Sequence, residues 1–394
     1  MERFNLKNRR YIGSKTKLIE WVFGSLKLNN IKSVCDIFAG SGVVAGQFAA
    51  IPNIKNIIIN DILFSNEIIY HAFFMGQDAD FKALEELKEY YNQALKLEEN
   101  YFSQHFSDKF FSYKDCVKIG SIREHIESLN LDKLNKDILL TSLIYSMDKI
   151  ANTVGHYEAY RKKEILQDRF IFELISPIKH DKNIMIERKN ANELAKTLKI
   201  DLVFIDPPYN SRQYSRFYHL YENLVQWKKP KLYGTALKPL CENMSEYCRS
   251  NAKKELSDLI EKLDCKRIAL TYNNTYNSKS SSSQNKIGFK DLVEILSFST
   301  TMRNPKRIGQ FLAVLGKFEN QILQSSTIMQ IVKSVLAHRL YRPTSINQNK
   351  ELKEKFDSNE YIFSDEELER IIEISPQQHK EMGFEHGWES RFDT

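Results

Sequence analysis

Four consecutive residues, Asp206, Pro207, Pro208 and Tyr209, carry the clearest chemical signal in this chain. They directly follow Leu202–Ile205, an apolar run that predicts a buried strand. Prolines donate no backbone hydrogen bond and hold the chain rigid, so a carboxylate, carbonyls and an aromatic face are presented together. Ligands bind at the carboxyl ends of strands in open α/β sheets. The motif predicts a site for an exocyclic amine, and a purely structural Pro-Pro stop is the less favoured interpretation.

In such a site, the Asp206 carboxylate and the Pro207 carbonyl accept the two protons of the amine. The nitrogen lone pair is thereby turned out of ring conjugation and towards an electrophile, and Tyr209 stacks on the ring. Catalysis by this arrangement comes mainly from positioning and electrostatics, and it needs no covalent intermediate.

A glycine-containing turn follows an earlier apolar run, Ser33–Phe38, and could cradle a second ligand. Glycines let a ligand approach the backbone where a Cβ would clash. An ordinary strand-to-helix turn explains these glycines equally well. The acidic residue and the missing third glycine favour a ligand with an amino-acid end over one with a pyrophosphate. The residues of this block are Asp36, Phe38, Ala39, Gly40, Ser41 and Gly42.

Asp61 and Ile62 follow the next apolar run, Asn56–Asn60, about 20 positions after the glycine turn. A carboxylate at this place can accept hydrogen bonds from both ribose hydroxyls of a nucleoside. The plainer alternative is a solvated aspartate at a strand end. Together with the glycine turn, Asp61 favours an adenosine-bearing cofactor.

The strands that must position these residues recur along the chain, and helical patterns lie between several of them. This alternation predicts an α/β fold with a parallel sheet. A late pair of apolar runs, Leu296–Met302 and Ile308–Gly316, flanks turn residues and predicts an antiparallel hairpin at one edge. The parallel strands are expected at 33–38, 56–60, 183–187, 202–205 and 267–272.

About 120 residues separate the second and third predicted strands, far more than an ordinary crossover needs. Helical periodicity at 79–99 and 132–150 predicts a mostly helical insertion, and a shorter insertion runs from Lys228 to Asn251. We therefore expect three parts: a catalytic domain at 1–70 and 182–318, a helical lobe at 71–181 that faces DNA or reads the target, and a helical extension at 319–394.

Composition narrows the class of protein. The 394 residues are 42% hydrophobic and 27% charged, and the longest apolar runs fall far short of a membrane helix, so we expect a soluble globular protein. The five cysteines are scattered without a CxxC pair, which argues against a zinc site and against a disulfide framework. This cysteine usage fits a protein of the reducing cytoplasm. Residues 319–394 carry a net charge of −5 and the rest of the chain +11. A basic body fits a polyanionic partner, although a merely soluble basic protein fits it too.

Over about residues 8–318, the sequence resembles the DNA N6-adenine methyltransferases of the alpha group, the Dam-like D12 class. The blocks stand in that family's order, with Tyr11-Ile12-Gly13-Ser14-Lys15 before them. Asn210-Ser211-Arg212-Gln213-Tyr214 sharpens the likeness to FokI-type restriction-modification methylases. The resemblance implies a Rossmann-like S-adenosylmethionine-dependent methyltransferase fold. It also implies site-specific methylation of adenine N6 in double-stranded DNA, and a cognate restriction endonuclease that forms no stable complex.

The resemblance also implies roles for individual residues. The acceptor motif Asp206 to Tyr209 would hold the target adenine. The implied cofactor contacts are Tyr11, Gly13, Lys15, Asp36, Phe38, Ala39, Gly40, Ser41, Gly42, Asp61, Ile62, Asn192 and Asp206.

A target adenine must leave the duplex before its amine can react. Two stretches supply basic and aromatic side chains for this step: 152–163, where the family carries a glycine-containing DNA-facing loop, and 212–216. For Arg212 and Arg216, phosphate-binding or structural roles are favoured over base readout. Tyr272 fits a wall of the base pocket and a core position equally well. The predicted DNA contacts are His156, Tyr157, Arg161, Lys162, Arg212, Gln213, Tyr214 and Arg216.

Other reactions remain open. N4-cytosine methylation acts on a chemically similar amine, but those enzymes usually begin the motif with Ser where this chain has Asp206. RNA adenine methylation uses a related motif, and a non-catalytic methylase-like DNA-binding module would not need intact cofactor blocks. None of the nine prolines is followed by cysteine, so the Pro-Cys nucleophile of cytosine-C5 methylation is absent.

Overall fold

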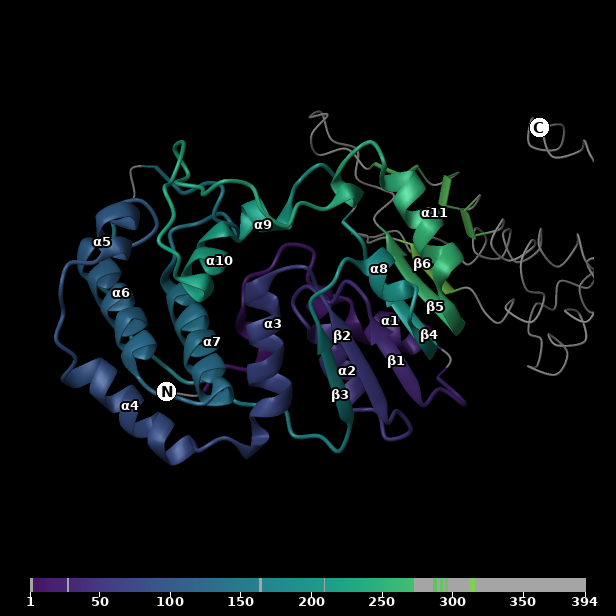
Figure 1. Ribbon diagram of the computed structural model, residues 1–394, viewed down its shortest axis with the longest axis horizontal. Coiled ribbons are helices and arrows are strands. Elements are labelled where there is room, and N and C mark those ends of the chain that lie inside the picture. Colours follow the sequence, from purple (N-terminus) through teal and green to yellow (C-terminus); the bar gives the residue numbers. More distant parts are fainter. Residues whose placement is uncertain are drawn as a thin grey trace, which may run out of the picture.

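The computed structural model describes residues 3–26, 28–162, 165–208, 210–272, 286–288, 291–292, 295–296 and 312–315. Within them the chain forms a six-stranded sheet of order β3-β2-β1-β4-β5-β6, and every neighbouring pair is parallel (Figure 1). The predicted α/β class and parallel sheet are confirmed. The strands are β1 Ser33–Asp36, β2 Asn56–Asn60, β3 Asn183–Glu187, β4 Lys199–Ile205, β5 Asp264–Tyr272 and β6 Leu312–Leu315.

The central strand β4 shows why these apolar runs become buried parallel strands. Successive side chains of a strand point to opposite faces. Leu202 and Phe204 therefore join the apolar core on one face of the sheet, whereas Val203 and Ile205 join the core on the other. Both faces are covered, so the run reads as continuously apolar rather than alternating.

The predicted antiparallel edge hairpin is wrong. The edge strand β6 pairs in parallel with β5, in the register that places Ala269 beside Leu312 and Tyr272 beside Leu315. Leu296, the expected start of the hairpin, is helical; residues 297–311 and Gly316 lie outside the described residues. A parallel neighbour requires a crossover of a dozen or more residues, and residues 273–311 provide the length for one.

Helices α4 to α7 gather with α10 on one side of the molecule and the sheet lies on the other, with α3 between them (Figure 1). Periodicity predicted helices in the regions of α4 and α7, but α6 was not predicted. Its buried residues include Asp115 and Arg123, so no clean apolar stripe marks it. The α-helices are α1 Ile19–Ser25, α2 Val43–Ala49, α3 Phe64–Tyr70, α4 Phe81–Gln93, α5 Tyr101–Phe106, α6 Tyr113–Ser128, α7 Lys133–Ile150, α8 Ala191–Ala195, α9 Tyr214–Phe217, α10 His219–Gln226 and α11 Ala252–Lys262.

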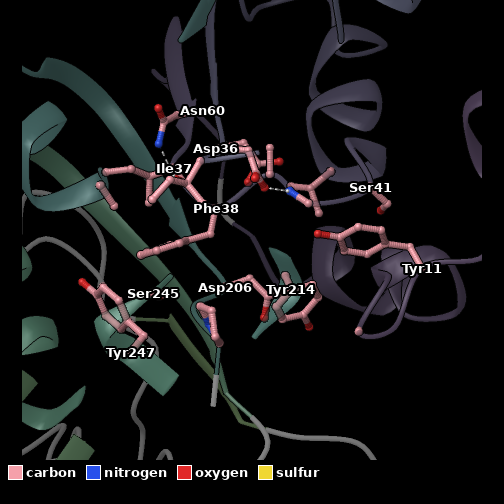
Figure 2. Close-up of a pocket in the computed structure, with 18 of the residues that line it drawn as sticks. Tyr11, Asp36, Ile37, Phe38, Ser41, Asn60, Asp206, Tyr214, Ser245 and Tyr247 are labelled. Carbon is pink, nitrogen blue, oxygen red and sulfur yellow. Dashed lines mark hydrogen bonds between the residues drawn. The ribbon is translucent and has the colours of Figure 1, made fainter. Parts of the chain in front are cut away.

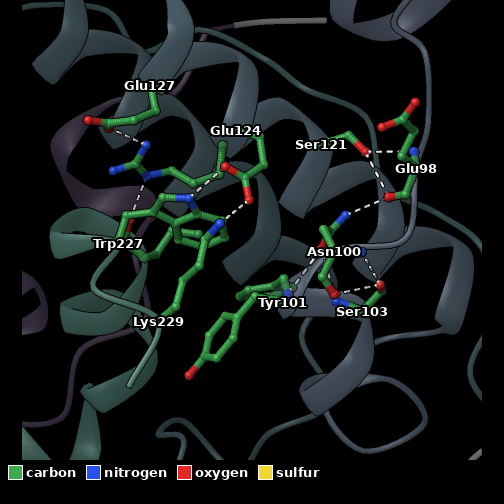
Figure 3. Close-up of polar contacts among 12 residues, drawn as sticks. Glu98, Asn100, Tyr101, Ser103, Ser121, Glu124, Glu127, Trp227 and Lys229 are labelled. Carbon is green, nitrogen blue, oxygen red and sulfur yellow. Dashed lines mark hydrogen bonds and ion pairs between the residues drawn. The ribbon is translucent and has the colours of Figure 1, made fainter. Parts of the chain in front are cut away.

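Helix α6 holds the carboxyl end of α10 in place (Figure 3). The buried Arg123 guanidinium donates to the Leu224 carbonyl (2.7 Å) and the Val225 carbonyl (3.3 Å). Glu124 accepts from Trp227 Nε1 (3.0 Å) and Lys229 Nζ (2.5 Å). Carbonyls at the end of a helix lack intrahelical partners, so these bonds fix α10 against the helical side of the molecule.

Short helical segments connect these elements. Four are 3₁₀ turns and one, His71–Met75, is a π-helical turn that continues α3. The 3₁₀ turns are Leu6–Asn8, Lys15–Lys17, Gly76–Asp78 and Glu246–Cys248. In the described part of the chain, no helix has both the length and the apolar character needed to cross a membrane. The predicted extension at 319–394 lies outside the described residues.

Candidate active site

An open cavity lies at the carboxyl ends of β1, β2 and β4. Figure 2 shows Tyr11 and Tyr247 on opposite sides of it, with Asp36 and Asp206 between them. Parallel strands bring distant blocks together here because their carboxyl ends share one edge of the sheet. The predicted residues that line this cavity are Tyr11, Gly13, Lys15, Asp36, Phe38, Ala39, Gly40, Ser41, Asp61, Ile62, Asp206, Pro208, Gln213 and Tyr214.

The Asp206 carboxylate is held from two sides. The Lys15 ammonium forms an ion pair with Oδ2 and also donates to the Gly13 carbonyl (3.1 Å). The Thr271 hydroxyl, at the end of β5, donates to Oδ1 (2.7 Å). Both bonds use the carboxylate as an acceptor, so its orientation is set before any substrate arrives. Pro207 is buried and does not line the cavity, and Tyr209 lies outside the described residues.

Lys15 therefore contacts the acceptor motif as well as the cavity predicted for the cofactor. Thr271 was not predicted to touch Asp206, although a signal existed. In the parallel register, Ile205 pairs with Leu270, so the residues that follow them are neighbours. Tyr272, by contrast, is buried in the core and does not line the cavity.

Asp36 lies at the cavity wall with 1% of its surface exposed. Burial, together with the nearby Asp206 charge, raises its pKa well above the ordinary value for an aspartate. Its Oδ2 atom has no hydrogen-bond partner among the described residues. A buried carboxylate oxygen without a partner is costly, so an orphan at a cavity wall indicates a place for a cationic or donor ligand.

The glycine turn is fixed from both sides. The Gly40 N–H donates to Asp61 Oδ2 (3.0 Å), and the Gly40 carbonyl accepts from the Tyr70 hydroxyl (2.8 Å) and the buried Arg9 guanidinium (3.0 Å). Gly40 has a φ of 52°, and a Cβ there would lie 3.0 Å from Tyr11. Glycine is therefore required by the backbone and by the ring that packs on it. Burial, the largest cause, also raises the pKa of Asp61.

Two tyrosines after the acceptor motif, which we call the tyrosine clamp, hold the amino-terminal block. Tyr218 stacks on Tyr11 at 4.7 Å between ring centroids, and Tyr214 stacks at 5.4 Å. The Ile12 N–H donates to the Tyr218 hydroxyl (2.7 Å), and the Tyr214 hydroxyl donates to the Ile12 carbonyl (3.1 Å). The role of Tyr218 was missed, although its spacing of four residues from Tyr214 is that of neighbours on a helical surface.

A third wall of the cavity comes from the short insertion at 228–251. Tyr247 packs edge-on against Phe38, with ring centroids 5.0 Å apart. Asn192, a predicted cofactor contact, is buried and does not line the cavity; it accepts from the Tyr247 hydroxyl (2.8 Å). Its amide donates to the Glu255 carbonyl (2.9 Å), so its bonds are used within the protein. Asn190 and Ala191 line the cavity in its place.

Several predicted DNA contacts face inward. Tyr157 is 1% exposed, and its hydroxyl donates to the buried Asp148 (3.2 Å), so its side chain is unavailable to DNA. The Gln213 side chain is also occupied, because its amide bonds in both directions with the Ser245 backbone (2.9 and 2.8 Å). Tyr214 belongs to the tyrosine clamp. The polar atoms of these three side chains already have hydrogen-bond partners within the protein. The side chains therefore position other elements of the protein instead of contacting DNA.

The remaining predicted contacts lie further out. Arg161 and Lys162 are exposed, and Arg212 is exposed beside Glu158 at 3.8 Å. His156 stacks on Phe217 with ring centroids 4.4 Å apart. The half-buried Arg216 donates to the Pro239 carbonyl (2.8 Å). Gly42, predicted beside the cofactor, is the N-cap residue before α2 and does not line the cavity.

An open parallel sheet with a glycine turn, an acidic strand end and an Asp-Pro-Pro motif around one cavity defines an α/β enzyme that binds a nucleoside-like cofactor. The sequence pattern of the D12 class N6 adenine-specific DNA methyltransferases matches residues 11–287, and the chain belongs to this family. Membership in this family makes it an adenine-specific DNA methyltransferase.

Three relatives illustrate the match. The chain is 30% identical over 286 residues to the Type II methyltransferase M.NlaIII of Neisseria lactamica, covering 67% of this chain and 83% of the relative. It is 30% identical to the Modification methylase StsI of Streptococcus sanguinis and 29% identical to the Type II methyltransferase M.FokI of Planomicrobium okeanokoites. Each of these two alignments covers 67% of this chain but only 44% of the relative, so the chain spans less than half of their length.

Proposed function

We propose that the cavity holds S-adenosylmethionine and a flipped adenine side by side, and that Asp206 aligns adenine N6 for transfer of the methyl group. The observation that carries this proposal is that the orphaned Asp36 Oδ2 and the clamped Asp206 carboxylate line the same cavity. Asp36 Oδ2 suits a cationic ligand, and the Asp206 carboxylate suits an amine that donates hydrogen bonds.

The residues present fit the cofactor. The amino-acid end of the cofactor carries an ammonium group, which the Asp36 carboxylate would accept. The Asp61 carboxylate would accept from the ribose hydroxyls while it keeps the Gly40 N–H. Phe38 and Tyr247 would flank the base. When bound, the cofactor supplies an electrophilic methyl group on a sulfonium.

In the transfer step, Asp206 and the Pro207 carbonyl hold the two N6 protons, and Tyr209 stacks on the adenine. This geometry would turn the nitrogen lone pair towards the methyl group that the bound cofactor would supply, with a neutral thioether as the leaving group. The proton lost from N6 would pass to Asp206 or to solvent. Lys15 and Thr271 hold the carboxylate in this geometry throughout.

Double-stranded DNA is the proposed substrate partner, with the helical lobe at 71–181 facing it. The exposed Arg161, Lys162 and Arg212 are the predicted contacts whose side chains can reach a duplex. Tyr157, Gln213 and Tyr214 act instead as positioning residues. As with the relatives named modification methylases, we propose a cognate endonuclease that shares the target sequence without forming a stable complex.

The test is methyl transfer by Asp206→Ala. We expect a loss in kcat on the order of 100-fold or more, because the acceptor that aligns the amine is removed. Mass spectrometry of duplexes incubated with isotope-labelled S-adenosylmethionine measures N6-methyladenine and distinguishes it from N4-methylcytosine. Asp181→Ala is the matched control, because Asp181 is an exposed residue of a surface ion pair. Full activity of Asp206→Ala would overturn the assignment, whereas the cofactor titration of this variant shows whether it is folded.

A further inference from the structure

A second hollow lies beside the active-site cavity and has a different chemistry. Its charged lining residues are Arg10, Lys149, Arg161 and Arg169, and none of the described lining residues is acidic. All four cationic residues are exposed. We call this hollow the basic groove. Four cations around one concavity make it a site for a polyanion, because each anionic group that binds is met by a charge of the opposite sign.

The floor of the basic groove is built by the end of α7. Arg10 donates to the Ala151 carbonyl (3.2 Å) and the Lys149 carbonyl (3.4 Å). The Asn152 amide donates to the Lys109 carbonyl (2.9 Å) and the Arg161 carbonyl (3.0 Å), which connects this lining residue to both segments. Carbonyls at a helix carboxyl end repel anions, so the Arg10 guanidinium on them makes the floor compatible with a bound anion.

Apolar side chains also line the basic groove and are left in solvent. Val154 is 54% exposed and Ile165 is 91% exposed. Cations interleaved with exposed aliphatic groups fit a nucleic acid strand, which alternates phosphates with apolar sugar faces, better than a small free anion. An acidic peptide is the competing occupant, and the experiment below separates the two.

Two consecutive residues line the basic groove and the active-site cavity. Arg10 lines the groove, and the next residue, Tyr11, lines the active-site cavity. The Arg10 N–H donates to the buried Asp148 (2.8 Å), which anchors this junction to α7. The loop beside the groove is tied to the segment after the acceptor motif, because the Tyr157 N–H donates to the Phe217 carbonyl (2.8 Å).

We propose that the basic groove binds the phosphate backbone of the duplex on the flank of the flipped adenine, with Lys149, Arg161 and Arg169 as phosphate ligands. Arg10 fixes the floor on which they act. The groove thus sets where the duplex lies relative to the cavity, independently of which base is read. The proposal rests on DNA being the substrate, as it is for the family.

The test is the salt dependence of duplex binding by the triple variant Lys149→Gln, Arg161→Gln, Arg169→Gln. Each lost phosphate contact should lower the steepness of log K against log salt by about 0.9, so we expect a decrease of up to about 2.7. At about 0.1 M salt, this should weaken binding roughly 10-fold or more. The matched control is Lys32→Gln, Lys82→Gln, Lys199→Gln, three exposed lysines that do not line the groove and remove the same charge.

The expected result is a shallower slope in the groove variant alone, with S-adenosylmethionine affinity and thermal stability unchanged in both. The same slope of log K against log salt in the groove and control variants would overturn the proposal. If the wild-type chain still methylates DNA, that outcome leaves the proposed reaction unaffected. Wild-type methylation that fails on every duplex would instead contradict the function of the site. Retained duplex binding together with lost binding of poly-glutamate would favour the acidic peptide and also overturn the proposal.

Discussion

Asp36 is a buried acidic group whose ionised form needs a counter-charge. Because burial raises its pKa, the protein without cofactor favours the protonated carboxyl. The stability that this protonated form contributes is present below the ordinary pKa and is lost as pH rises through the raised one. A bound ammonium reverses the preference, because it pairs with the ionised form. Cofactor binding should therefore release a proton where Asp36 is still protonated.

This gives a pH prediction. S-adenosylmethionine should bind more tightly as the pH rises through the raised pKa of Asp36, and calorimetry in buffers of different ionisation heat measures the accompanying proton release. Asp36→Asn should bind weakly and should lose the part of the pH dependence that Asp36 causes. The same variant should unfold at a higher temperature than the wild type without cofactor at neutral pH, because it carries no buried carboxylate. A mutant with the wild-type pH profile would contradict this role.

At the scale of elements, the segment α9–α10 joins the two halves of the active site. Its amino-terminal end carries the tyrosine clamp, and its carboxyl end is held by Arg123 of α6. It also caps another helix, because the Glu222 carboxylate accepts from the Ser65 N–H (2.7 Å) and the Phe64 N–H (3.2 Å) at the start of α3. Helix α3 directly follows Asp61, so one segment positions both cofactor blocks.

The clamp can be tested with Tyr218→Phe, which keeps the stacked ring but removes the acceptor of the Ile12 N–H. A buried N–H without a partner costs about 1–3 kcal/mol, so cofactor affinity should fall on the order of 10-fold. Tyr91→Phe is the control, because Tyr91 is a buried tyrosine outside the cavity. A positioning role requires that the Kd for S-adenosylmethionine rises in Tyr218→Phe while its kcat at saturation stays close to wild type. Equal changes of the Kd in Tyr218→Phe and Tyr91→Phe would show that the clamp contributes only packing and does not position the cofactor site.

At the scale of the whole molecule, the sheet and the helical side share one apolar core. Phe48 of α2 and Phe204 of β4 belong to the same cluster of buried residues as Ile119 of α6 and Leu143 of α7. A continuous core favours unfolding as one cooperative unit. The boundary expected at 71 falls where the π-helical turn His71–Met75 continues α3, and a measurement of unfolding tests whether 71 and 181 separate stability units.

We expect Leu143→Ala to lower the free energy of unfolding by about 2–5 kcal/mol, because the fully buried side chain leaves a cavity. The lower stability should appear as a single thermal transition at a lower temperature. Circular dichroism and the loss of stabilisation by the cofactor should report the same transition. Leu240→Ala, at a side chain that is 73% exposed, should leave the transition unmoved. Two separate transitions in Leu143→Ala, with cofactor protection surviving the first, would show that the helical side unfolds alone.

The amino-acid sequence by itself determined the strands and the chemistry at their ends. β2 and β3 begin and end where the apolar runs predicted. Asp36, Asp61 and Asp206 were predicted as site residues because a parallel sheet collects its strand ends at one edge. Local patterns contain this information, so no long-range contact had to be known.

Tertiary structure decided what depends on contacts between distant residues. Tyr157 and Asn192 look available for ligands in the sequence. In the folded protein, Tyr157 is hydrogen-bonded to Asp148, and Asn192 is hydrogen-bonded to Tyr247 and to the Glu255 carbonyl. The parallel edge strand could not be read from turn residues, since the direction of pairing depends on a crossover rather than on local chemistry. Arg10 and Arg169 lie far apart in the chain, and only the folding of α7 between them brings both to the basic groove.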